Sequence, residues 1–237
     1  MKKDIQYSII FQSVFVTLLF VGTLWLITGV EELLKLDLGF LGILPRSVEG
    51  TIGIFTGPLV HGSMSHLYSN SLPLALLCFG LFYLHSKVSL EVFAIIYVCS
   101  GLFVWIAARD AYHIGSSGIV YGLVSFLLFI GLLAREPRSI VVALVVIIFY
   151  GGMFYGLVPS DGDLSWESHL FGALTGVFCA FYYFYKKRMP VRLKTKPALI
   201  PTANRRLANP YSAEKMTHTH PKAAEVSYFY TEDKSKE

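Results

Sequence analysis

The chain has 237 residues, of which 54% are hydrophobic and only 15% are charged, and its mean hydropathy is +0.56. A water-soluble domain of this length cannot bury so much apolar surface, so the composition excludes an ordinary soluble protein and indicates a membrane protein. The net charge of +4 is unevenly spread: residues 186–237 carry 12 basic and 5 acidic residues, a balance of +7, which leaves −3 for the remainder.

Apolar segments recur along the first 187 residues, each close to the roughly 20 residues that a helix needs to cross a bilayer. We predict an all-α membrane protein with six transmembrane helices, over residues 9–28, 66–84, 90–108, 117–134, 139–157 and 169–185. The first helix is interpreted as a retained anchor, because its apolar run is too long for a secretory signal and no small-x-small cleavage site follows it. Residues 1–188 form the predicted membrane domain.

Lysine and arginine gather on the cytoplasmic side of membrane proteins, which predicts the orientation of the chain. The predicted cytoplasmic cations are Lys2, Lys3, Lys87, Arg135, Arg138 and those from Lys186 onward. We therefore expect a multi-pass protein of the cell (inner) membrane with both termini cytoplasmic. The basic stretch after the last helix favours contact with anionic lipid headgroups, so the lipid bilayer is an expected partner and nucleic acid is not. Residues 189–237 form a basic, proline-containing tail that we expect to be disordered.

Polar residues inside membrane helices are costly and are therefore candidates for function. The first group is Gly115-Ser116-Ser117-Gly118, at the start of the fourth predicted helix. Backbone N–H groups at a helix N-terminus are unpaired and carry the positive end of the helix dipole, so they can stabilise an oxyanion beside a serine. The alternative is that one of the two serines only caps the helix.

The second group is His169, at the start of the sixth predicted helix, followed by Gly172 and Gly176. Glycines four residues apart allow two helices to approach closely, and Gly118 and Gly122 form a similar strip on the fourth helix. If these strips meet, the side chains of Ser117 and His169 come within hydrogen-bonding reach. A single interfacial histidine beside packed glycines is, however, commonly structural.

The third group, His61, His66 and Asn70, leads into the second predicted helix. Uncharged N–H donors in a water-poor place suit an oxyanion hole. Two histidines also suit zinc, but no His-Glu-x-x-His motif is present, and histidines five residues apart do not share a helix face. We therefore expect no metal and no cofactor. Polar contact between helices is a structural alternative for Asn70.

Together these groups resemble the pattern of the rhomboid intramembrane proteases, in the family's order and on its second, fourth and sixth helices. The three motifs read HGSMSHLYSN, GSSG and HLFGALTG, and the resemblance covers about residues 9–187. It implies a six-helix rhomboid-like bundle and a serine endopeptidase that cleaves transmembrane protein substrates. The roles it implies are nucleophile for Ser117, general base and acid for His169, oxyanion donors for His61 and Asn70, a structural position for His66, and packing on the catalytic imidazole for Tyr121.

Members of this family use a Ser-His dyad without an aspartate. Glu167 is two residues before His169 and points elsewhere on a helix, whereas Asp163, in a loop, stays an alternative carboxylate. The Trp-Arg pair of many bacterial members is missing from the first loop. Two further functions stay open. A catalytically silent client-binding relative usually lacks the serine or the histidine, and a transporter requires polar residues through the full membrane depth.

Overall fold

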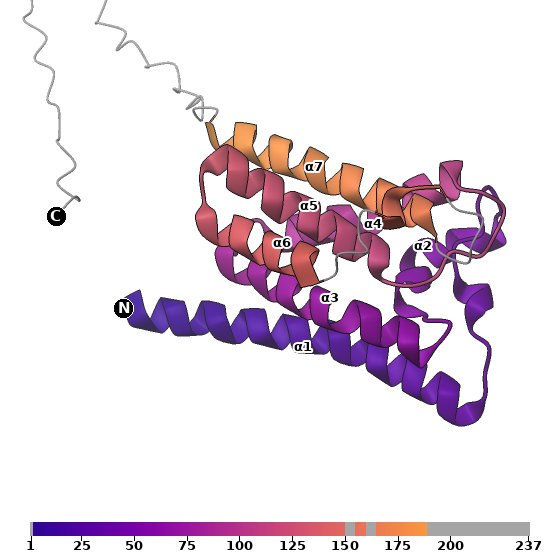
Figure 1. The fold of residues 1–237 in the computed structure, drawn as a ribbon. Coiled ribbons are helices and arrows are strands. Elements are labelled where there is room, and N and C mark those ends of the chain that lie inside the picture. The colour runs from indigo at the N-terminus through magenta and orange to yellow at the C-terminus, as the bar shows by residue number, and fades with distance from the viewer. Residues whose placement is uncertain (1, 150–154, 160–164, 189–237) are drawn as a thin grey trace, which may run out of the picture. The chain divides into compact units, whose positions relative to one another are not determined.

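The computed structural model describes residues 2–149, 155–159 and 165–188. It divides into two compact units, residues 1–191 and 192–237, and the second unit lies wholly outside the described residues, as does the predicted tail. The described chain is built from helices (Figure 1). The long helices are α1 (Lys2–Leu34), α3 (Met64–Leu84), α4 (Ser89–Ala107), α5 (Ser117–Ala134), α6 (Pro137–Phe149) and α7 (Trp166–Arg188).

The predicted boundaries of the spans at 66–84, 90–108 and 117–134 agree with α3, α4 and α5 to within two residues. The predicted span over residues 139–157 is described in two parts: α6 to Phe149, and a 3-10 turn, η5, at Tyr155–Leu157, while residues 150–154 lie outside the described residues. At its other end α6 begins with Pro137, a residue that suits the first turn of a helix.

Four described helices, α1, α3, α4 and α5, are long and apolar enough to cross a membrane. Helix α6 is apolar but has only 13 described residues, while α7 has 23 residues and a more polar sequence that includes several tyrosines and ends in Lys186, Lys187 and Arg188. The chain is therefore a helical membrane protein with at least four helices of spanning character.

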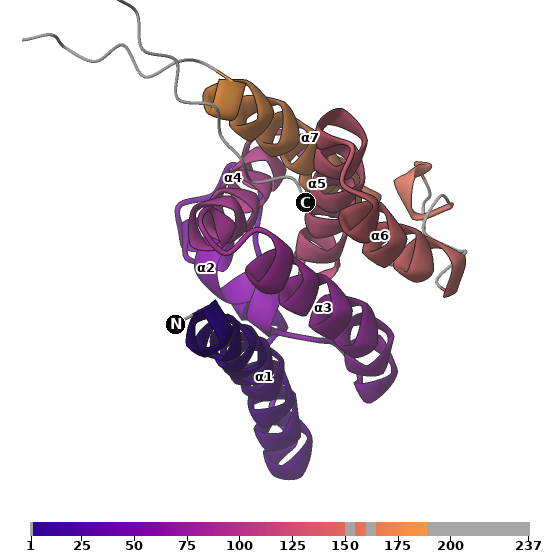
Figure 2. The same cartoon turned by 90° about the vertical axis from the view of Figure 1, so that its left-hand side faces the viewer.

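Helix α5 lies between the others, packing against α7, α6, α3 and α4, as the end-on view in Figure 2 shows. Its two faces are both buried, which explains why it lacks a polar stripe. Many fully buried side chains of the core come from α3 and α5, among them Leu67, Leu74, Leu77, Leu81, Ile119, Leu123, Phe126 and Leu127.

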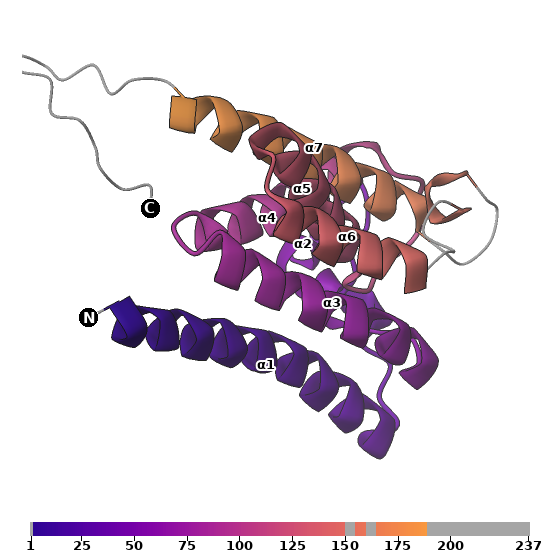
Figure 3. The ribbon, with the colours of Figure 1, turned by 60° about the vertical axis from the view of Figure 1, so that its left-hand side comes forward.

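Helix α1 lies at the edge of the bundle, against α3 (Figure 3). The Trp25 indole N–H donates to the Ser71 hydroxyl at 3.0 Å, and Leu24 is fully buried in the shared core. The opposite face of α1 exposes large apolar side chains such as Phe11 and Leu18, as expected of a helix that faces lipid.

Residues 35–63 fold over the loop-rich end of the bundle in short turns: η1 (Gly39–Leu41), η2 (Glu49–Thr51), α2 (Gly53–Thr56) and η3 (Gly57–Leu59). The Arg46 guanidinium donates to the Ala108 carbonyl at 2.7 Å, and the Trp105 indole donates to the Ser47 carbonyl at 2.9 Å. Arg46 also pairs with Asp110. These contacts anchor the loop to the end of α4 in a chain that lacks the Trp-Arg pair in the loop itself.

Candidate active site

Ser117 is the first residue of α5, and Ser116 occupies the N-cap position without any side-chain capping hydrogen bond. The Ser116 hydroxyl instead lies 3.3 Å from His61 Nε2. The turn before the helix depends on Gly115, which has a φ of +98° and lies against the His66 ring: an added Cβ would be 2.6 Å from His66 Cε1. Neither serine thus has the capping hydrogen bond that was considered as an alternative.

The Ser117 hydroxyl and the His169 imidazole are in hydrogen-bond contact, with 2.8 Å between Ser117 Oγ and His169 Nε2. His169 lies in the first turn of α7 and is only 6% exposed. The expected approach of the two side chains is therefore present in the structure.

Close packing of α5 and α7 produces this contact. A Cβ added to Gly172 would lie 2.0 Å from the Gly118 carbonyl oxygen, and one added to Gly176 would lie 2.0 Å from the Gly122 carbonyl oxygen. The two predicted glycine strips therefore meet backbone to backbone, where no side chain fits.

The other nitrogen of His169 faces a backbone carbonyl. Nδ1 lies 2.8 Å from the Gly156 oxygen, and because a carbonyl only accepts, Nδ1 carries the proton and the Nε2 lone pair points at Ser117. Tyr121 stacks on the same ring, with centroids 4.3 Å apart and 10° between the planes. These two contacts set the tautomer and the orientation of the imidazole.

Gly156 was missed by sequence reasoning. A Cβ at this position would lie 2.2 Å from the Tyr121 hydroxyl and 2.9 Å from His169 Nδ1, so only glycine brings its carbonyl this close. It belongs to no motif, and nothing in the sequence distinguishes it from the other glycines near it.

No carboxylate hydrogen-bonds His169 within the described part of the chain. Glu167 is buried and pairs with Arg109, whose Nε lies 3.4 Å from Glu167 Oε1, so it points away from the dyad as predicted. Asp163 lies outside the described residues.

His61 is 1% exposed, and its Nε2 accepts the backbone N–H of Ser116 at 3.4 Å. Its proton is then on Nδ1, which is buried, and the Leu59 backbone lies near the ring. Burial, with a smaller effect of neighbouring His66, lowers the pKa of His61 to about 4, so the ring is neutral near pH 7. Because both nitrogens are enclosed, this geometry does not fit the oxyanion-donor role predicted for His61.

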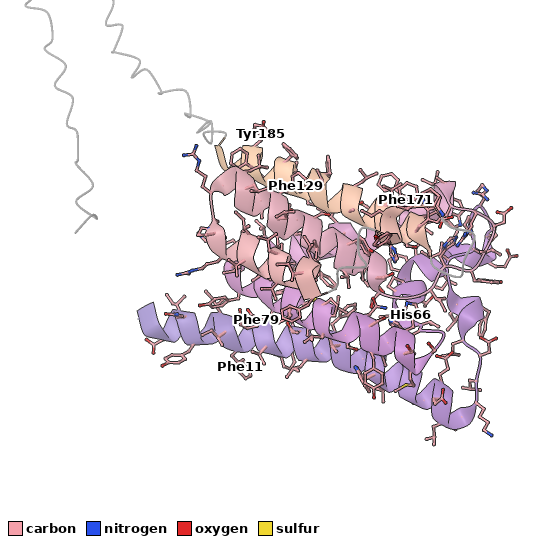
Figure 4. All side chains as sticks on the ribbon, in the orientation of Figure 1. Phe11, His66, Phe79, Phe129, Phe171 and Tyr185 are labelled. Atoms are coloured by element: carbon pink, nitrogen blue, oxygen red, sulfur yellow. The ribbon has the colours of Figure 1, made fainter. Side chains whose placement is uncertain are left out.

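His66 and Asn70 lie one turn apart on α3, at the loop-rich end of the bundle where Figure 4 labels His66. The His66 ring packs against Gly115 and is close enough to His169 for the two to interact electrostatically. The Asn70 amide donates one N–H to the His66 carbonyl at 3.1 Å, which leaves its second N–H available. The structure therefore places the His66 ring beside the turn that leads into Ser117.

A second buried histidine, His113, was not singled out from the sequence. Its Nε2 lies 3.1 Å from the Arg109 carbonyl and its Nδ1 lies 2.6 Å from the Ser165 hydroxyl, which in turn accepts the Ser168 backbone N–H at the start of α7. Burial lowers the pKa of His113, which matches a neutral ring that donates from Nε2 and accepts at Nδ1. Its backbone pairs with Ile43, so His113 joins the first loop to the start of α7.

Fold and site together define a helical membrane protein whose polar side chains gather at one end of an apolar bundle, around a serine and a histidine in contact. The Rhomboid domain family model matches residues 49–186, which hold all of these residues. The chain belongs to the rhomboid family.

The chain is also similar to curated proteins of mycobacteria. Uncharacterized proteins of Mycobacterium tuberculosis (strain H37Rv) and Mycobacterium bovis are each 34% identical to this chain over 186 residues, which cover 75% of this chain and 78% of each relative. An uncharacterized protein of Mycobacterium leprae is 30% identical over 186 residues, covering 75% of this chain and 74% of that protein.

Proposed function

We propose that this protein is an intramembrane serine endopeptidase that cleaves transmembrane segments of other membrane proteins, with Ser117 as nucleophile and His169 as general base. The observation that carries the proposal is the 2.8 Å contact from Ser117 Oγ to His169 Nε2, combined with the Gly156 carbonyl at Nδ1. A hydroxyl becomes a useful nucleophile when a positioned base accepts its proton, and this arrangement supplies that base.

The proposed reaction is acyl transfer in two steps. His169 Nε2 accepts the Ser117 proton as Oγ attacks the scissile carbonyl, and it then donates that proton to the leaving amine. Water, deprotonated by the same nitrogen, then attacks the ester carbonyl of the acyl-enzyme; the bond to Ser117 Oγ breaks, the proton returns to Oγ, and the carboxylic acid product leaves. The Gly156 carbonyl stabilises the imidazolium that forms in each step, a task that a carboxylate performs in serine proteases with a triad.

For the oxyanion we propose the side chains of His66 and Asn70 and the backbone N–H of Ser117. This proposal exchanges the roles expected for the two histidines, so that His66 is the oxyanion donor and His61 is structural. The reason is that His61 Nε2 accepts the Ser116 backbone N–H and His61 Nδ1 is buried. His61 is then a positioning residue that holds the turn before Ser117. Each oxyanion donor contributes about 10²-fold to 10³-fold in rate.

In the membrane, we propose that α6 and α7 complete a set of six spanning helices. The connections at one end of the bundle hold the cations Lys87, Arg135 and Arg138, which makes that end cytoplasmic by the distribution of basic residues. The dyad lies at the other end, at the start of α5 and α7, so cleavage occurs near the outer surface of the cell (inner) membrane.

A silent client-binding function is the main alternative, since membership of the family does not by itself establish catalysis. The contact of Ser117 with His169 favours an enzyme, because a binding function does not require a base at the serine. A transporter is disfavoured because the part of α5 beyond Ser125 is apolar, with Phe126, Leu127 and Ile130 buried in the core.

The test is cleavage of a reporter transmembrane substrate by the purified full chain in liposomes. Ser117→Ala and His169→Ala should each lower the rate by at least about 10⁴-fold, because the members of such a site act as a unit. Ser116→Ala is the matched control and should keep most of the activity, since its hydroxyl contacts His61 and not His169.

A fluorophosphonate probe should label the wild type and Ser116→Ala but not Ser117→Ala. Undiminished cleavage by Ser117→Ala would reject the dyad. A wild type that neither cleaves varied substrates nor reacts with the probe would favour the client-binding function.

A further inference from the structure

A cavity of about 280 Å³ lies at the end of the bundle opposite the dyad, between the start of α1, the end of α3 and the turn from α5 to α6. Its volume is near the lower limit of small-molecule sites, about 300 Å³. Its walls include Ile5, Ile9, Leu84, Tyr83, Glu136 and Arg138.

The wall of the cavity formed by α1 and α3 is mainly apolar. Ile5, Ile9 and Leu84 present hydrocarbon to it, and Ile5 is 57% exposed. Helix α1 lies at the edge of the bundle (Figure 3), so the cavity adjoins the surface that faces lipid. An acyl chain can lie along such a wall without leaving hydrocarbon, because lipid tails and these side chains are similarly apolar, whereas a soluble ion gains nothing from it.

The polar rim of the cavity has one carboxylate, Glu136, that already has partners, and one cation, Arg138, that can bind a ligand. Glu136 Oε2 accepts from the Ser139 hydroxyl at 2.5 Å and lies 3.7 Å from His85 Nε2. Arg138 is exposed and has no hydrogen bond or ion pair within the described part of the chain. The rim therefore has an unused guanidinium, a group that binds phosphate through two parallel hydrogen bonds.

We propose that this cavity binds an anionic phospholipid, with an acyl chain along Ile5, Ile9 and Leu84 and the phosphate at Arg138. The apolar wall and the Arg138 guanidinium are adjacent, which matches the acyl chain and the phosphate of one lipid. The basic residues at this end of the bundle favour a position at the anionic surface of the membrane. The proposal goes beyond the proposed function and does not depend on catalysis.

Native mass spectrometry of the full chain, released from vesicles of phosphatidylcholine with a minor fraction of phosphatidylglycerol, tests the proposal. The wild type should retain one phosphatidylglycerol in preference to phosphatidylcholine. Arg138→Gln should lower this preference about tenfold, the loss expected for one charge-assisted contact of about 1.5 kcal/mol. Arg135→Gln is the matched control: it removes the same charge from the same turn, but Arg135 does not line the cavity.

A second variant examines the apolar wall. Ile9→Trp should fill the cavity and lower retention of phosphatidylglycerol while Arg138 is unchanged. Added inorganic phosphate should not displace the lipid; displacement at millimolar concentration would show that the site takes free phosphate and would overturn the assignment of a lipid.

Equal retention of both lipids by the wild type would also overturn the proposal, as would equal losses in Arg138→Gln and Arg135→Gln. Labelling of Ser117 by the fluorophosphonate probe reports separately on the proposed enzyme, so the two proposals can fail independently.

Discussion

At the scale of single residues, the proposed dyad depends on contacts that leave the His169 ring one useful orientation. The Gly156 carbonyl holds the proton on Nδ1, Tyr121 covers a face of the ring, and Nε2 is left facing Ser117. A free imidazole would divide its time between two tautomers and many rotations. The site therefore favours the reaction by holding the His169 ring in the one tautomer and orientation that can accept the Ser117 proton.

The two histidines that precede Asn70 should behave differently when they are replaced. His66→Ala removes a proposed oxyanion donor and should lower the turnover number by about 10²-fold with little change in thermal stability. His61→Ala leaves the buried Ser116 N–H unpaired and should lower the unfolding free energy by about 1–3 kcal/mol. Cleavage kinetics and thermal unfolding in the same detergent measure the two effects. The reverse pattern would restore His61 as the donor.

The stability of the protein should also depend on pH through His61. Its pKa is lowered by burial from 6.5 to about 4, so below pH 6.5 the unfolded chain binds more protons than the folded one. The stabilising effect is fully present above about pH 6.5 and is lost progressively as the pH falls towards 4. His113 acts in the same direction, because its pKa is also lowered. The measurement is the unfolding midpoint between pH 7.5 and 4, in which His61→Asn should show a smaller decrease than the wild type.

At the scale of elements, the site is assembled by the packing of α5 on α7. At the paired glycines no side chain lies between the two helices, and their backbones are in direct contact. The first turns of α5 and α7 are therefore adjacent. The η5 turn, which comes after α6 in the sequence, supplies the Gly156 carbonyl from outside α5 and α7. The dyad therefore depends on three separate elements.

The backbone contact of Gly118 and Gly122 with Gly172 and Gly176, here called the glycine seam, makes Gly176 sensitive to substitution although it is two helical turns away from His169. Gly176→Ala places a methyl group 2.0 Å from the Gly122 carbonyl oxygen, so the helices must separate, which should cost about 1–3 kcal/mol and reduce cleavage. Gly29→Ala is the control, because a Cβ there meets no atom within 4 Å and alanine favours helix. Thermal unfolding and reporter cleavage measure both changes. Equal tolerance of the two substitutions would contradict the role of the seam.

At the scale of the whole molecule, the described charged groups divide between the two ends of an apolar bundle. Arg46, Asp110 and Glu167 lie at the end that holds the dyad, and Lys87, Arg135 and Arg138 lie in the turns at the other end. Such a distribution directs insertion, because loops rich in lysine and arginine are retained in the cytoplasm.

The proposed orientation predicts the result of reporter fusions. Alkaline phosphatase, which is active only outside the cytoplasm, should be inactive when fused after Lys87 or Arg138 and active when fused after Asp110. The activities of the three fusions measure the topology directly. An active enzyme after Arg138 would contradict the assignment of α5 and of the outer site.

Several parts of this protein follow from the sequence alone. The apolar segments specify the helices α3, α4 and α5, the spacing of Gly172 and Gly176 specifies a close-packing face, and the position of Ser117 after Gly115 specifies a helix start. Hydrophobic periodicity, helix length and glycine spacing are local properties, and a membrane leaves few alternative structures for such segments.

Only the tertiary structure decided which groups surround His169. Gly156 contributes through its backbone oxygen and His113 through contacts more than fifty residues away in the chain, so neither has a local signature. His61 and His66 are similar in sequence context, and their separation into one enclosed ring and one beside the dyad depends on how the first loop packs on the start of α5. The contribution of η5 to the site likewise depends on packing and not on the apolar segment before it. Contacts between distant segments follow from packing of the whole bundle, and local sequence patterns do not encode them.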